Sequence, residues 1–155
     1  FAEIAGQPAF SDEAWLRHQE ALRIGQRQRQ QSPSGRAGLK FYQNLYGSHP
    51  YANPLAGYAA SVERISPKAI KAFHSRYYTV GNAVLVLVGD IDRDQAERIA
   101  REMSSALLPG PAAEPLAMPI ALKRGQREHI EMPSQQTGVL RGELGRRRQW
   151  PDYFP

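Results

Sequence analysis

The 155-residue chain contains no cysteine. This absence excludes disulfide bonds, iron–sulfur clusters, cysteine-ligated zinc and a thiol nucleophile. The chain also lacks an apolar run near the roughly 18–20 residues that a membrane-spanning helix requires, so we expect no membrane segment. It begins with Phe1 and has no basic-then-apolar leader. We therefore expect a processed chain or a fragment of a longer one.

Local motifs for metal binding and catalysis are missing as well. The histidines are widely separated, at His18, His49, His74 and His129. A helix-borne zinc site needs two histidines about four positions apart, so there is no local zinc motif. The chain has no G-x-S-x-G turn, no P-loop and no G-x-G-x-x-G fingerprint. We expect neither a catalytic residue nor a bound cofactor in it.

The positive charge of the chain is concentrated in arginine. Lys and Arg number 20 against 15 Asp and Glu, which gives a net charge of +5, and the arginines gather in residues 17–40 and 141–148. One interpretation is a basic nucleic-acid-binding module, and the other is a solvated helix face plus a basic turn. We favour the second, because aromatic residues do not interleave with these arginines to stack on bases.

Hydrophobic spacing and capping residues predict four helices. Ser11 is a good N-cap for the first, with Asp12 and Glu13 beside the positive end of its dipole, and Ser32-Pro33 ends it. The other three are residues 34–46, the helix opened by Ser66-Pro67, and the helix that Asp92 and Gln95 begin as a capping box.

The sequence also predicts three strands. Residues 83–88 form an unbroken, mostly branched run, typical of a central strand buried on both faces. After a proline-rich stretch, residues 128–132 and 137–144 read as two further strands. One buried strand without earlier partners is unusual in a self-contained domain, and its unpaired edges predict a homodimer.

A series of short motifs between Leu45 and Gly110 carries a family resemblance. In order, the motifs are Leu45-Tyr46-Gly47, His49-Pro50-Tyr51, Pro54-Leu55-Ala56-Gly57, Ile65-Ser66, Phe73-His74, Tyr77-Tyr78, Asn82-Ala83, Val86-Leu87-Val88-Gly89-Asp90 and Leu107-Leu108-Pro109-Gly110. The series resembles the pitrilysin/insulinase family of zinc peptidases, which includes the mitochondrial processing peptidase and bacterial two-subunit proteases.

The resemblance implies a fold class and a domain organisation. The fold would be α+β, with helices packed on an antiparallel sheet in a LuxS/processing-peptidase-like metallohydrolase architecture that is incomplete in this chain. Residues 1–110 would be the later half of one repeat domain. Residues 111–125 would be a linker, and residues 126–155 the opening strands of the next repeat domain.

The zinc-binding residues of active family members have no counterpart here. Active members carry H-x-x-E-H, with two histidine ligands and a glutamate as general base, and this chain has no copy. Their third ligand is a glutamate in the helix that matches the first predicted helix. The corresponding position falls near Gly25 and Gln26, neither of which supplies an anionic ligand. The resemblance therefore implies an inactive bacterial homologue without zinc.

Such a homologue would be a non-catalytic, insulinase-type subunit or domain that assists peptide binding and proteolysis. The implied partners are a zinc-bearing homologous subunit and peptide substrates, and the bacterial members imply a periplasmic location. Two alternatives stay open. One is a fragment of an active zinc metalloendopeptidase whose H-x-x-E-H part is outside this chain, and the other is the nucleic-acid-binding module.

One loop is a candidate functional element. Residues 46–57 include two prolines, two glycines and two tyrosines, which indicates an ordered loop rather than a flexible linker. Within it, His49, Pro50 and Tyr51 are the candidate functional residues. The alternative is that they form a packed turn that holds two helices together.

Overall fold

The structure is a computed structural model that describes residues 1–145. The chain divides into two compact units. Unit 1 comprises Phe1–Gln19 and Glu63–Leu116, and unit 2 comprises Glu20–Val62 and the remainder from Ala117. The boundary falls inside helix α2 (Asp12–Gln31), so each unit holds part of that helix.

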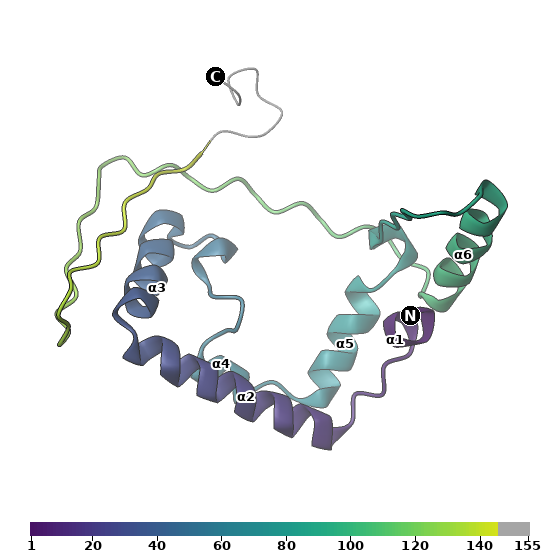
Figure 1. The fold of residues 1–155 in the computed structure, drawn as a ribbon, viewed down its shortest axis with the longest axis horizontal. Coiled ribbons are helices and arrows are strands. Elements are labelled where there is room, and N and C mark those ends of the chain that lie inside the picture. The colour runs from purple at the N-terminus through teal and green to yellow at the C-terminus, as the bar shows by residue number, and fades with distance from the viewer. Residues whose placement is uncertain (146–155) are drawn as a thin grey trace. The chain divides into compact units, whose positions relative to one another are not determined.

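Unit 1 holds α1 (Ala2–Gly6), the short 3-10 helix η2 (Val80–Asn82) and two longer helices, α5 (Pro67–Tyr77) and α6 (Arg93–Ala106) (Figure 1). Helix α1 contacts α6 so closely that a Cβ at Gly6 would overlap the main-chain oxygen of Ala106. The buried residues of unit 1 are His74 and Thr79, and none of its hydrophobic residues is buried. This unit therefore has no apolar core of its own.

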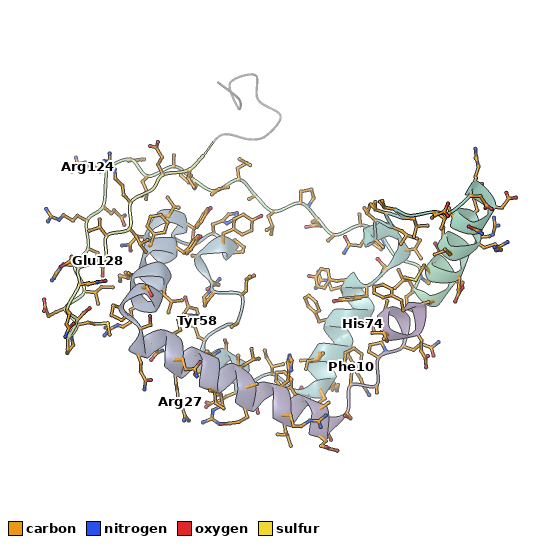
Figure 2. The ribbon with its side chains drawn as sticks, in the orientation of Figure 1. Phe10, Arg27, Tyr58, His74, Arg124 and Glu128 are labelled. Atoms are coloured by element: carbon orange, nitrogen blue, oxygen red, sulfur yellow. The ribbon has the colours of Figure 1, made fainter. Side chains whose placement is uncertain are left out.

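His74 in α5 is one of the two buried residues of unit 1. Its Nε2 lies 2.7 Å from the main-chain oxygen of Ala5, to which it donates. The Phe10 ring meets it edge-on at 5.3 Å, and the Tyr78 ring stacks on it at 4.6 Å (Figure 2). A hydrogen-bonded aromatic cluster thus joins α5 to the end of α1.

Unit 2 holds the rest of α2, followed by α3 (Pro33–Tyr46), η1 (Pro50–Ala52) and α4 (Ala59–Val62). Its buried hydrophobic residues are Leu45, Ala52 and Val62. Helix α3 contacts η1 directly. It ends at Gly47, whose φ of +54° is the left-handed conformation that a glycine adopts without steric penalty.

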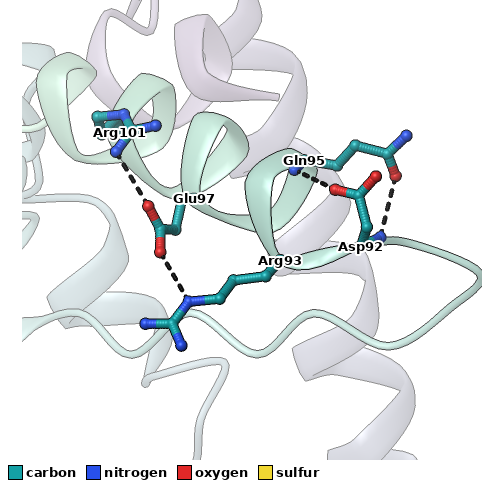
Figure 3. Close-up of polar contacts among 5 residues, drawn as sticks. All are labelled: Asp92, Arg93, Gln95, Glu97 and Arg101. Atoms are coloured by element: carbon teal, nitrogen blue, oxygen red, sulfur yellow. Dashed lines mark hydrogen bonds and ion pairs between the residues drawn. The ribbon is translucent and has the colours of Figure 1, made fainter.

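The predicted helix starts are confirmed by their caps. Ser11 Oγ accepts from the Ala14 amide at 3.3 Å, and Ser66 Oγ accepts from the Ala69 amide at 3.2 Å. At the start of α6, Asp92 Oδ1 accepts from the Gln95 amide at 2.7 Å, and Gln95 Oε1 accepts from the Asp92 amide at 3.2 Å (Figure 3). Helix α2 ends at Gln31, as expected. Helix α3 begins at Pro33, one residue before the predicted start at residue 34, and Ser32 is its N-cap.

The predicted α+β fold with an antiparallel sheet is wrong for this chain. The described residues form helices, turns and extended segments, and their one β-type pairing is an isolated parallel bridge between Thr79 and Leu108. Residues 83–88 are not a buried strand, since Val84, Val86 and Val88 are 90%, 74% and 92% exposed. Residues 128–132 and 137–144 are likewise unpaired. A strand forms only where a neighbour accepts and donates its ladder hydrogen bonds, and no described segment does so.

The proline-rich segment after α6 is fixed to the end of α5 over its first residues. The Val80 amide donates to Leu108 O at 3.0 Å, and Thr79 Oγ1 donates to Pro111 O at 3.1 Å. Asn82 Oδ1 accepts from the Ala113 amide at 2.9 Å. This part of the predicted linker is thus an anchored extended segment. Within residues 1–145, no helix has the length and apolar character needed to cross a membrane.

Candidate functional site

The structure distinguishes the two residues at the predicted third-ligand position. Gln26 is buried, with 6% of its surface exposed. Its Nε2 donates to Ala56 O at 2.8 Å and to Gly57 O at 3.1 Å. Gln26 therefore ties α2 to the turn formed by residues 54–57, which the Gly57 amide closes by donating to Pro54 O at 2.9 Å.

Gly25 lies on the exposed surface of α2, and a Cβ placed there would meet no heavy atom within 4 Å. A side chain at position 25 would enter open space and could not reach the groups that surround Gln26. Of the two positions, position 26 alone is enclosed by protein atoms.

The enclosed position does not fit a zinc ion. Gln26 presents its amide nitrogen to two carbonyl oxygens, and the lone pair of an amide nitrogen is delocalised into its own carbonyl group and does not coordinate a metal. No group of three or more histidine, aspartate or glutamate side chains that could hold a metal ion occurs in the described part of the chain. The Gln26 side chain instead makes a structural contact with main-chain oxygens.

The residue that follows the 54–57 turn is hydrogen-bonded to α3. Gln43 Nε2 in α3 donates to the Tyr58 hydroxyl at 2.9 Å. Beyond the turn, the Tyr58 amide donates to Ser61 Oγ at 3.0 Å, and that hydroxyl donates to Tyr58 O at 2.7 Å. Two glutamines, one from α2 and one from α3, thus fix the segment that leads into α4.

His49, Pro50 and Tyr51 lie together at the end of α3. His49 Nδ1 accepts from the Tyr51 amide at 3.2 Å, so this nitrogen carries no proton. The proton is therefore on Nε2, which lies 2.8 Å from Ala117 O and donates to it. Both ring nitrogens of His49 are engaged, and neither is available as a base or as a metal ligand.

Aromatic packing completes this turn. The Tyr51 ring lies edge-on to the rings of His49 and Tyr46, at 4.8 and 5.6 Å, and Tyr42 stacks on Tyr46 at 6.1 Å. Pro50 opens η1 as its first residue. This geometry favours the packed-turn alternative, while a functional role for the loop stays a prediction.

The segment that begins at Ala117, whose main-chain oxygen accepts from His49, also contacts α3 at Glu128. Glu128 Oε1 pairs with Lys40 Nζ at 3.0 Å, and Oε2 accepts from Asn44 Nδ2 at 2.9 Å (Figure 2). The hydrogen bonds from Asn44 and Lys40, together with the Lys40 charge, lower the pKa of the Glu128 carboxyl. Farther along, the Phe41 ring lies against Gly142.

These contacts were not predicted from the sequence. Asn44 and Glu128 are 84 positions apart, and Gln43 and Tyr58 are 15 apart. The residue types involved are common on solvated surfaces, so no local pattern marks them as partners. Only the family resemblance pointed to Gln26. Because it lies in a run of polar residues, hydrophobic spacing could not show that it is buried.

Unit 1 contains a shallow, mostly apolar hollow of about 750 Å³. Its wall includes Phe73, Tyr77 and Tyr78, together with Met103 of α6 and Leu107, which follows that helix. No acidic, basic or histidine side chain lines it. The hollow can therefore make apolar contacts but offers no carboxylate or imidazole to bind a metal ion.

One arginine of the basic stretches forms an ion pair: Arg17 pairs with Glu13 at 3.6 Å in α2. Outside those stretches, Glu97 in α6 pairs with both Arg93 and Arg101 (Figure 3). The predicted basic turn at residues 146–148 lies outside the described residues. A nucleic-acid-binding role stays an untested alternative.

Comparisons with known proteins agree on one family. The family model described as peptidase M16 inactive domain matches residues 64–155. A crystal structure of a peptidase M16 inactive domain from Pseudomonas fluorescens is 38% identical, with a TM-score of 0.76, over 77% of this chain and 29% of that one.

Curated relatives point the same way. The zinc protease PqqE of Helicobacter pylori is 28% identical over 69% of this chain and 24% of its own length. An uncharacterized zinc protease of Mycobacterium leprae is 29% identical over 79% of this chain and 28% of its own. The chain thus spans about a quarter of these relatives.

The predicted resemblance to a zinc-peptidase family, and to its inactive members, is confirmed. The more specific assignments to pitrilysin or to processing peptidases stay predictions. The family match covers more than half of the chain and includes α5, α6 and the segment that docks on α3. This chain belongs to the peptidase M16 inactive domain family.

Proposed function

We propose that this chain is part of a non-catalytic, peptidase-like domain that assists a zinc-bearing homologous subunit in binding and cleaving peptides. The observation that carries the proposal is Gln26, whose amide is committed to two carbonyl oxygens where an active member would need an anionic ligand. The family description supports the non-catalytic part, and the relatives named as zinc proteases support peptides as the substrate class.

A peptidase assay tests this function. The chain alone, with added zinc, should give no turnover of a quenched fluorescent peptide above background. Addition of the homologous zinc-bearing subunit from the same organism should give chelator-sensitive turnover that exceeds that of the subunit alone. Chelator-sensitive turnover by the chain alone would contradict the proposal, and so would a zinc-bearing subunit whose rate does not change when the chain is added.

A second candidate is a fragment of an active zinc metalloendopeptidase. The names of the Helicobacter and Mycobacterium relatives favour it. The two candidates differ in one observable feature, the H-x-x-E-H motif, which this chain does not contain. The coding sequence upstream of Phe1 decides between them, because an intact motif there would favour the active enzyme.

The proposal includes the periplasm as the location and a second copy of the chain as a further partner. Exposed Val84, Val86 and Val88 support self-association, since an extended apolar segment with unpaired main-chain groups invites pairing. Cell fractionation tests the location. Sedimentation velocity at several concentrations tests the dimer, and a monomer at all concentrations would contradict it.

A further inference from the structure

We infer that Gln26 is a hydrogen-bond latch that requires a neutral amide, so that a glutamate at this position would release the 54–57 turn rather than create a metal ligand. This inference concerns the stability of unit 2 and does not depend on the proposed function. It follows from the donors and acceptors that surround one side chain.

The orientation of the Gln26 amide follows from its neighbours. Nε2 has two N–H groups, and two carbonyl oxygens, those of Ala56 and Gly57, lie 2.8 and 3.1 Å from it. The flipped amide would place Oε1 against both carbonyl oxygens, which is repulsive. Gln26 therefore donates twice, and these two bonds fix the turn to α2.

An ionised carboxylate cannot make these bonds. It only accepts, so both of its oxygens would be confronted with acceptors in a buried position. Gln26 Oε1 already lacks a hydrogen-bond partner among the described residues. A glutamate would therefore lose both donors and add a desolvated charge.

Protonation of that glutamate would partly restore the latch. A protonated carboxyl has one O–H, which can donate to either Ala56 O or Gly57 O. Residues 54–57 carry no ionisable side chain, and Gln43 on α3 is neutral. The charged and titratable side chains near Gln26 and the turn in the sequence include Arg23 and Arg29, three positions from Gln26 along α2, and Tyr58, which follows the turn.

The experiment compares three variants of the full chain by hydrogen–deuterium exchange at the Gly57 amide, which closes the turn. Gln26→Glu tests the charge. Gln26→Met has similar length without a donor or a charge. Gln28→Glu is the matched control, because it adds the same charge to the exposed side of the same helix.

All exchange rates are corrected for the intrinsic rate of the amide. At pH 7.5 we expect the Gly57 amide to exchange about tenfold faster than in wild type, or more, in both Gln26→Glu and Gln26→Met. In Gln28→Glu its rate should stay within about twofold of wild type. At pH 4 the Gln26→Glu rate should return to within about threefold of wild type, while Gln26→Met stays fast. Zinc content of Gln26→Glu should not exceed that of wild type.

Equal exchange in Gln26→Glu and Gln28→Glu at pH 7.5 would overturn the inference, as would a wild-type rate in Gln26→Met. If Gln26→Glu does not fold at pH 7.5, folding at pH 4 supports the latch. If it folds at neither pH, the Gln26→Met rate decides, and a wild-type rate overturns the inference.

Discussion

Two glycines of unit 2 provide a matched pair in which the same substitution should have opposite effects. Gly25 lies inside the 20-residue helix α2, where a Cβ meets nothing within 4 Å. Gly57 has φ +64°, and a Cβ there would lie 3.3 Å from Ser61 Oγ and from Val62 Cγ2. Gly25→Ala should therefore stabilise the protein, and Gly57→Ala should destabilise it.

The magnitudes follow from backbone conformation. In an exposed helix interior, alanine is favoured over glycine by about 1 kcal/mol. At Gly57, the left-handed conformation costs alanine about 1–2 kcal/mol, and the two tight contacts add to this. For a chain of this size, each kcal/mol moves the melting temperature by about 2–4 °C. We expect a rise of about 2–4 °C for Gly25→Ala and a fall of about 2–8 °C for Gly57→Ala.

The assay is thermal unfolding followed by far-ultraviolet circular dichroism at one protein concentration. Urea unfolding of both variants provides an independent free energy of unfolding. A lower melting temperature for Gly25→Ala would refute the assignment of residue 25 to an open helix face. An unchanged or higher value for Gly57→Ala would refute the left-handed turn that positions the partners of Gln26.

Two other predictions concern the cap of α6 and the Glu128 carboxyl. Asp92→Ala removes the cap of α6 and should cost about 1 kcal/mol by urea unfolding. Arg101→Ala removes one exposed ion pair, worth about 0.3–0.5 kcal/mol, so its loss should be smaller, and equal losses would contradict this ranking (Figure 3). Because the pKa of Glu128 is lowered, its contact with Lys40 and Asn44 stabilises the fold at pH values above the ordinary pKa of 4.5. This stabilisation is lost as the pH falls through the lowered pKa. The Asn44 side-chain amide signals should therefore shift on acidification, and Glu128→Gln should abolish that shift; a shift that persists in Glu128→Gln would contradict its assignment to this carboxyl.

The helices could be predicted because their signals are local. Ser11, Ser66 and Asp92 each cap an amide three residues onward, so the residue type and the spacing together indicate the start of the helix. The short elements α1, α4, η1 and η2 were missed. Each has five residues or fewer, which is too short for a periodic pattern to develop.

The strands were predicted wrongly because a strand is not a local structure. The branched residues of segment 83–88 favour extended backbone, and Ala83 is extended, with φ −112° and ψ 145°. A sheet, however, also needs a partner strand. The run of apolar residues was interpreted as burial on two faces. In the described residues no second segment covers Val84, Val86 or Val88, which are exposed.

The candidate site could be located from the sequence only in part. The resemblance directed attention to Gly25 and Gln26, but helical spacing alone could not say which of them is enclosed. That distinction depends on the turn at residues 54–57, which reaches α2 from some 30 positions away. For His49, the sequence left a functional loop and a packed turn open, and the two hydrogen bonds of its ring favour the turn.

Zinc content tests the central claim, that this chain carries no metal site, most directly. The chain is equilibrated with zinc, dialysed against metal-free buffer and measured by elemental analysis alongside its protein concentration. We expect well under a tenth of a zinc ion per chain, because a stable site requires about three protein ligands. The described residues contain no group of three histidine, aspartate or glutamate side chains that could hold a metal ion, and Gln26 offers only a neutral amide. A value near one zinc per chain would contradict the account.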